Sequence, residues 1–255
     1  MTGEQPNAVY RVAWAVAALV AVGVLVLSLL VVLGRGPWLP GVADCTVEAG
    51  GRSVELSAQE AQSAASVAAG AVRVRASAAR AERAVASVLD APDADVRLVT
   101  AALTGRVPHA LSCRHGGADH AESDRLDAAG LTGRTERVRR DLRAAFGPLK
   151  EGGFAPGGVR SGHMVGSAHY EGRAVDVFFR PVNRRNRTGG WATAQYLVAH
   201  AQRLEIDTVI FDARIWTARR ADEGWRTYRL DTSGRSRQVA AILLHRDHVH
   251  VDVAG

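Results

Sequence analysis

The segment from residue 161 to residue 179, SGHMVGSAHYEGRAVDVFF, contains one pattern written nearly twice. Ser-x-His-x-x-Gly-x-Ala begins at Ser161 and begins again at Ser167, so that His163 and His169 hold equivalent places. Only the second copy continues to an acid, Asp176. This arrangement raises the question of whether the segment binds a metal, and through which histidine.

Asp176 belongs to a run that reads as a β-strand. In RAVDVFF, Ala174 and Phe178 share a face with Asp176, and the opposite face is apolar. A buried carboxylate is costly unless it is paired or bound to a metal. The turn predicted at Glu171-Gly172 would bring His169 back beside Asp176.

The run HRDHVHVDV, from residue 245 to residue 253, is the second unusual strand. Strand alternation puts His248, His250 and Asp252 on one face and only valines on the other. The valine face predicts core, so the histidine face should line a groove or a site. For either strand alone, the alternative to a metal site is a set of polar residues that hydrogen-bond within the sheet. Because two such strands occur together, a metal site is favoured. A catalytic zinc takes three protein ligands from His, Asp or Glu, which His169, Asp176 and one histidine of this strand could supply.

These two motifs carry a resemblance. Ser167-x-His169-x-x-Gly172-x-Ala174-x-Asp176, followed by a His-x-His strand, resembles the D-alanyl-D-alanine carboxypeptidase, murein endopeptidase and Hedgehog-type zinc fold. The similarity extends from about residue 135 to residue 253. It implies an α+β domain with a mainly antiparallel sheet, and the irregular mixture of helical and strand-like runs favours the same class. The motif IFDARIW…RDHVHV is also similar to a C-terminal domain of exported actinobacterial proteins.

The resemblance assigns roles to individual residues. It implies that His169, Asp176 and His250 bind Zn²⁺. It also implies that Arg160 binds the substrate carbonyl or carboxylate and stabilises the oxyanion. Three further residues are expected around the ligands: Ser167, His163 and His245.

The general base has two candidates. The carboxypeptidase branch has Glu-x-x-His, and its glutamate position is Asp247 here, which is one methylene shorter. The murein endopeptidase branch has His-x-x-His-x-His, which His245, His248 and His250 match in full. We therefore predict that His248 is the base and that Asp247 is the second candidate.

The N-terminal part contains an expected membrane anchor. Val12 to Leu33 is 22 residues without a charge, enough to span a hydrocarbon core of about 30 Å. A signal peptide is the alternative, but its apolar stretch is usually about 7–15 residues. The positive-inside rule favours a cytoplasmic tail at 1–11 and an extracytoplasmic C-terminal domain. The only two cysteines, Cys45 and Cys113, lie beyond the anchor and predict a disulfide, with two free thiols as the alternative.

The remaining chain divides by composition. We expect a linker at 34–56, an alanine-rich helical region at 57–113, a second linker at 114–131 and the zinc peptidase-like domain at 132–255. A capping box of Ser57 and Glu60 marks the first helix. Further helices are expected near 135–146 and 191–204, and strands near 173–180, 207–216, 225–230 and 248–253.

The net charge and the distribution of the arginines indicate which classes of binding partner to expect. The net charge is +6, and Lys150 is the only lysine, which indicates a GC-rich genome more than a function. The arginines are scattered without an aromatic ladder, so nucleic acid is not expected. The prediction is a membrane-anchored zinc metallopeptidase, a hydrolase that acts on peptidoglycan stem peptides or cross-links in the cell wall. The alternative is a catalytically silent zinc-fold module that binds the cell wall or a partner protein.

Overall fold

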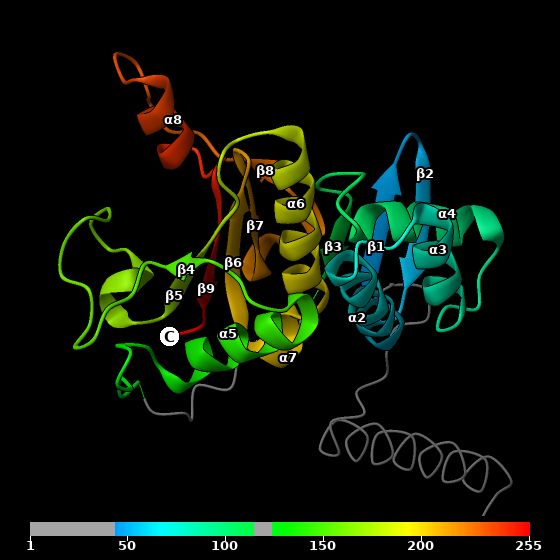
Figure 1. Ribbon diagram of the computed structural model, residues 1–255, viewed down its shortest axis with the longest axis horizontal. Coiled ribbons are helices and arrows are strands. Elements are labelled where there is room, and N and C mark those ends of the chain that lie inside the picture. The colour runs from blue at the N-terminus through cyan, green and yellow to red at the C-terminus, as the bar shows by residue number, and fades with distance from the viewer. Residues whose placement is uncertain (1–43, 115–123) are drawn as a thin grey trace, which may run out of the picture. The chain divides into compact units, whose positions relative to one another are not determined.

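Two antiparallel sheets and seven α-helices make up the part of the chain described by the computed structural model, residues 44–114 and 124–255 (Figure 1). This part is one compact unit. The predicted α+β class with antiparallel sheets is confirmed. Within the two described ranges, no helix has both the length and the apolar character needed to cross a bilayer. The expected anchor at 12–33 lies outside them.

The larger sheet has six strands in the order β4-β5-β9-β6-β7-β8, and all neighbouring pairs are antiparallel. Their bounds are β4 (Glu151–Gly152), β5 (Ala174–Phe178), β6 (Ile206–Phe211), β7 (Arg214–Thr217), β8 (Arg226–Thr227) and β9 (His248–Val253). The expected strand at 207–216 is in fact two strands. Asp212 and Ala213 between them both have positive φ, which makes the tight two-residue turn of a hairpin.

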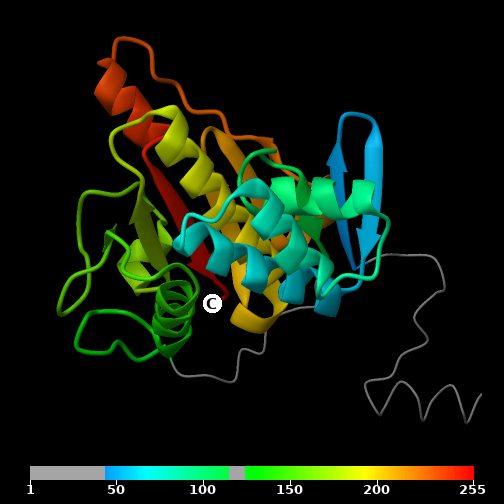
Figure 2. The ribbon, with the colours of Figure 1, turned by 45° about the vertical axis from the view of Figure 1, so that its right-hand side comes forward.

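Helix α6 (Arg184–Ala199) packs against one face of this sheet, followed by the short α7 (Ala201–Leu204). The valines of β5 and β9 share a hydrophobic core with Ala194, Leu197 and Val198 of α6 (Figures 1 and 2). The helix expected near residues 191–204 begins seven residues earlier than expected, and His200 separates it into α6 and α7. Because the valine face is covered, the His/Asp face of the same strands is left for a site.

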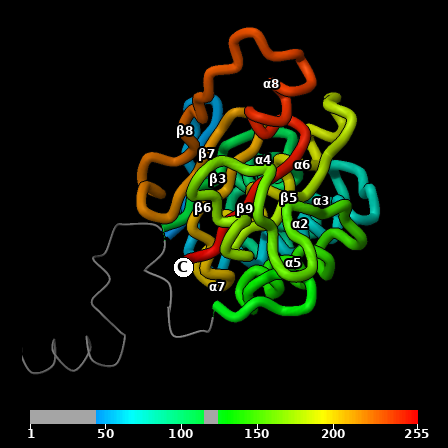
Figure 3. Tube along the Cα trace, turned by 90° about the vertical axis from the view of Figure 1, so that its left-hand side faces the viewer, coloured from blue at the N-terminus to red at the C-terminus, as the bar shows by residue number. Residues whose placement is uncertain are grey.

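Helix α5 (Gly133–Phe146) and two 3₁₀ helices complete the C-terminal part. Thr132 caps α5, and Gly147 ends it with a positive φ, close to the expected bounds. The 3₁₀ helices are η1 (Ala168–Glu171) and η2 (Ala218–Glu223). Helix α8 (Arg237–Leu243) has no buried residue and extends away from the sheet (Figure 3).

The N-terminal part of the described chain is not all helix. β1 (Cys45–Ala49), β2 (Arg52–Leu56) and β3 (Leu111–Cys113) form a sheet in the order β2-β1-β3. Residues 45–56, which the sequence predicted as linker, are thus a hairpin. Cys45 lies directly opposite Cys113, and their sulfurs are bonded at 2.03 Å, which confirms the disulfide.

Three helices follow the hairpin: α2 (Ala58–Arg73), α3 (Ala78–Ala86) and α4 (Asp93–Leu103). Ser57 and Glu60 form the predicted capping box on α2. The buried positions of α2 are all alanine, which allows close packing of its backbone against neighbouring helices. Pro92 immediately precedes α4.

Gln195 of α6 joins this helical region to the large sheet. Its buried side chain accepts hydrogen bonds from the amides of Ala110 and Leu111, both at 2.9 Å, and donates to the carbonyls of Ala102 and Val107. The two parts therefore share one interior.

Candidate metal centre

His169, Asp176 and His250 come from three elements and meet on the uncovered face of the sheet. Asp176 and His250 are directly opposite residues in the central strands β5 and β9, so their side chains point the same way. His169 lies in η1, and Gly172, in the left-handed conformation, ends that turn and leads into β5. The predicted turn that returns His169 to Asp176 is therefore present, and it is a 3₁₀ turn. All three side chains are buried.

The three residues have the spacing of a metal site. His169 Nε2 lies 3.1 Å from His250 Nδ1 and 3.3 Å from Asp176 Oδ1, and His250 Nδ1 lies 3.1 Å from Asp176 Oδ1. Tetrahedral ligands at about 2.0–2.1 Å from a zinc ion lie about 3.3 Å from one another. This buried group could hold a metal ion.

Each histidine of the group has its other ring nitrogen engaged. His169 Nδ1 lies 2.7 Å from the carbonyl oxygen of Gly153, and His250 Nε2 lies 2.6 Å from Asp252 Oδ1. With these nitrogens carrying the proton, His169 Nε2 and His250 Nδ1 present lone pairs to a cation. Such outer partners orient metal-binding histidines in known sites.

Gly153 can be close to His169 only because it has no side chain. A Cβ there would lie 2.2 Å from His169 Cε1, and the residue also has a φ of +79°. Its position is fixed by the neighbouring strand β4, because the buried carboxylate of Glu151 binds Arg139 and Arg143 of α5. Gly153 was not among the residues predicted from the sequence, where the pair of glycines after Glu151 was its only signal.

Electrostatics keep this group charged. Burial opposes ionisation of Asp176, but hydrogen bonds from His169 and His250 outweigh it and hold the pKa of Asp176 well below its usual range. Burial likewise opposes the charged form of His250, but the charge of Asp252 and the hydrogen bond to Asp176 raise the pKa of His250 to about 10. The charged forms of Asp176 and His250 thus stabilise each other.

His248 shares the face of His250 and lies at the edge of the ligand group. Its Nε2 is 3.7 Å from Asp176 Oδ1, and its Nδ1 is 2.7 Å from Asp247 Oδ1. Asp247 also accepts a hydrogen bond from Arg180 Nε at 2.6 Å. Because a carboxylate only accepts, the hydrogen bond to Asp247 requires a proton on Nδ1. Nε2 is then the ring nitrogen that faces His169, Asp176 and His250. Arg180 was not predicted from the sequence, because one more arginine after a strand carries no signal in this arginine-rich chain.

The two flanking histidines do not belong to the ligand group. His163 stacks on the ring of His169 with a centroid distance of 3.9 Å. The ring centroid of His245 lies 4.6 Å from that of His248, and burial together with the charges of His250 and His248 lowers the pKa of His245 to about 3. Both contact the centre as the sequence predicted. Ser167 caps η1, with its Oγ accepting from the His169 amide at 3.4 Å.

The centre opens into a pocket of about 500 Å³. Its rim is apolar and includes Met164, Val165, Tyr228 and Ile242. Arg160, the expected substrate-binding arginine, is exposed and does not line this pocket. The structure thus brings together the predicted histidines and Asp176 but not Arg160, which lies in the loop that precedes the two motifs.

One family model matches the chain. It is described as the C-terminal domain of VldE and covers residues 127–239, less than half of the 255 residues. The matched range includes His169 and Asp176 and ends before β9 with His250. No curated protein and no solved structure matches the chain.

Proposed function

We propose that this chain is a membrane-anchored, extracytoplasmic zinc peptidase that cleaves stem peptides or cross-links of peptidoglycan. The observation that carries the proposal is the position of His248 Nε2, which lies 3.7 Å from Asp176 Oδ1 and beside three atoms with the spacing of metal ligands. A metal site that is only structural has no use for a proton acceptor at this position. The D-alanyl-D-alanine carboxypeptidase and murein endopeptidase resemblance of the two motifs supplies the substrate class.

Zinc fits the donor set better than a hard cation does. Two imidazoles and one carboxylate are typical of zinc peptidase sites, whereas Mg²⁺ and Ca²⁺ prefer oxygen ligands. When bound by His169, Asp176 and His250, zinc would supply Lewis acidity towards the peptide carbonyl and towards water. The proposed ligand atoms are His169 Nε2, Asp176 Oδ1 and His250 Nδ1.

His248 carries the proton transfers in this proposal. Its Nε2 takes a proton from the attacking water and gives it to the nitrogen of the leaving amine. Asp247 holds the Nδ1 proton of His248 and stabilises the imidazolium that forms after the first transfer. Arg180 holds Asp247 in turn. Asp247 faces His248 and Arg180, so it acts in this scheme by orienting the base.

The cellular location rests on the anchor expected at 12–33 and on the disulfide. The bond between Cys45 and Cys113 is favoured in an oxidising compartment. A topology reporter fused after Gly255 should be active outside the cytoplasm. Activity only in the cytoplasm would contradict the proposed location and leave the chemistry of the site unaffected.

A catalytically silent zinc module is the second candidate, because Arg160 does not line the pocket and no other arginine among the pocket residues replaces it. The two candidates differ in turnover. The test uses the full-length chain with zinc and purified muropeptides, and mass spectrometry identifies either the loss of a terminal D-alanine or the opening of a cross-link. A chelator should abolish hydrolysis.

Variants then identify the base. His248→Ala should keep the metal and lower kcat by about 10²–10⁴-fold. Asp247→Asn should lower kcat less, because it removes only the partner of Nδ1. His109→Ala, which replaces an exposed histidine away from the centre, is the matched control. An inactive Asp247→Asn beside an active His248→Ala would reverse the assignment, and a wild-type protein that binds zinc but cleaves no muropeptide would favour the silent module.

A further inference from the structure

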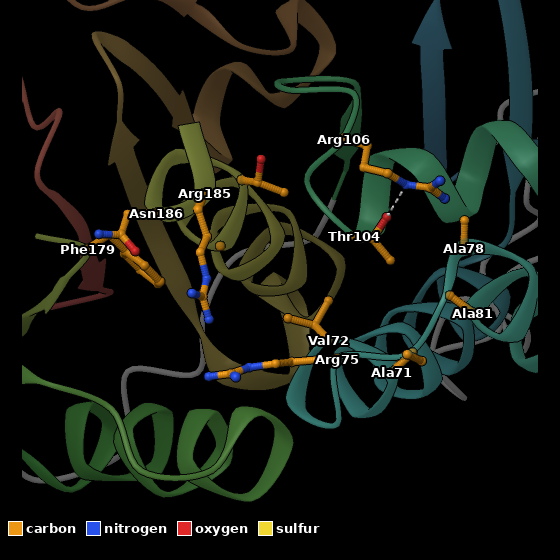
Figure 4. A pocket seen from close by; sticks show the side chains of 13 residues that line it. Ala71, Val72, Arg75, Ala78, Ala81, Thr104, Arg106, Phe179, Arg185 and Asn186 are labelled. Carbon is orange, nitrogen blue, oxygen red and sulfur yellow. Dashed lines mark hydrogen bonds between the residues drawn. The ribbon is translucent and has the colours of Figure 1, made fainter. Parts of the chain in front are cut away.

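A second pocket, of about 540 Å³, lies among the helices and shares no lining residue with the metal pocket (Figure 4). It is formed by the junction of α2 and α3, the end of α4 and the first turns of α6. Much of its lining is apolar, including Ala71, Val72, Ala81 and Phe179. No aspartate or glutamate lines it.

Three arginines line the same pocket, and they differ in their partners. Arg106 is engaged, since its Nε donates to Thr104 Oγ1 at 3.1 Å and its Nη2 lies 3.8 Å from Glu82. Arg75 and Arg185 have no acidic partner within the described ranges. In Figure 4 the side chains of these two reach towards the same end of the pocket. Both guanidinium groups line the one pocket and could contact the same anion.

The backbone at Arg75 is unusual for an arginine. Its φ is +52°, and the hydrogen bonds from Arg75 N to Val72 O and from Ala76 N to Ala71 O form the motif that ends α2. Glycine is the usual residue at this left-handed position, because any Cβ is strained there. An arginine thus occupies a position that favours glycine, and its exposed side chain lines a pocket where it has no acidic partner among the described residues.

We propose that this pocket binds a phosphate ester that has an apolar substituent, with the phosphate between Arg75 and Arg185 and the substituent on the alanine, valine and phenylalanine lining. Guanidinium groups match phosphate oxygens in charge and in geometry, since each can donate two parallel hydrogen bonds. The first turn of α6 also lines the pocket and adds the favourable dipole of a helix N-terminus. The site is independent of the metal centre and does not rest on the proposed peptidase activity.

The test measures binding by calorimetry on the full-length chain in a non-ionic detergent, with inorganic phosphate, phenyl phosphate, geranyl phosphate and phenol as probes. Both esters should bind more tightly than inorganic phosphate, and phenol should not bind. Tighter binding of geranyl phosphate would identify a lipid phosphate as the source, and tighter binding of phenyl phosphate a soluble ester. Binding of phenol as tight as that of phenyl phosphate, or no binding of either ester, would overturn the proposal.

Two variants separate binding from folding. Arg75→Gly removes the guanidinium and places the favoured residue at the left-handed position, so the Tm should stay the same or rise while affinity for the esters falls at least 10-fold. Arg185→Ala should weaken binding similarly. Arg80→Ala, which removes an equal charge from an exposed position outside the pocket, should bind as the wild type does. Equal affinity of Arg75→Gly and Arg80→Ala would show that Arg75 is not part of a site.

Discussion

Replacement of Gln195 by leucine should strongly destabilise the protein although it keeps the size of the side chain. The amides of Ala110 and Leu111 lose their shared acceptor in a buried place. The carbonyl of Ala102 is less affected, because it also accepts from the Gly105 amide at 2.8 Å. A buried donor without a partner costs about 1–3 kcal/mol. Two such amides predict a loss of about 2–6 kcal/mol, a large part of the roughly 5–15 kcal/mol typical of a folded protein.

Urea denaturation followed by tryptophan fluorescence would measure the change in the free energy of unfolding. Gln202→Leu is the matched control, since Gln202 is exposed in the short helix that follows. The control should stay within about 0.5 kcal/mol of the wild type, as exposed substitutions usually do. A loss below about 1 kcal/mol for Gln195→Leu would refute the reasoning, because it would show that the two amides find other partners and that Gln195 does not join the helical region to the sheet.

Three further predictions concern the histidines. His169→Ala should lose tight zinc binding while His163→Ala keeps it, measured as metal content after dialysis, and the reverse result would mean that the first copy of the motif holds the ligand. Zinc binding at pH 7 should release close to one proton, because Asp252 and Asp176 raise the pKa of His250 to about 10. Calorimetry in buffers of different ionisation enthalpy measures the number of protons released, and no release would contradict the raised pKa. Burial, reinforced by the charge of Arg203, lowers the pKa of His200 to about 4. As the pH falls from 6.5 to 4, His200 is therefore protonated in the unfolded chain before it is protonated in the folded protein, and the folded state loses stability across this pH range. Between pH 7 and pH 5 this contribution is about 2 kcal/mol, and urea titrations of His200→Gln should show that much less pH dependence than the wild type.

Periodicity made much of the centre predictable. In β9 every second residue is a valine, so the burial of the valine face determines the direction of His248 and His250 from the alternation alone. The isolated acid in β5 identified Asp176 for the same reason. Capping residues predicted the start of α2 and the end of α5.

Long-range packing was not predictable. The hairpin at 45–56 has the local pattern of a linker because its strands are short and its stability comes from pairing with β3, which lies more than fifty residues later. Arg180 meets Asp247 across 67 positions, and no local pattern connects them. For Arg160, in contrast, the sequence predicted a contact that the structure does not contain. The resemblance placed it at the site, but it does not line the pocket.

Gly153 has a consequence for the recognition of distant homologues. A side chain at this position would displace the ring of His169, so selection for the proposed metal site should retain glycine here as firmly as the three proposed ligands. A search pattern for this centre should therefore begin with Gly153, sixteen residues before His169, although Gly153 is not one of the proposed ligands. Among homologues, change at position 153 should coincide with loss of the ligands, and sequences in which it varies while all three ligands persist would contradict this expectation. Such a pattern would distinguish lineages that still assemble the centre from those that keep only the fold.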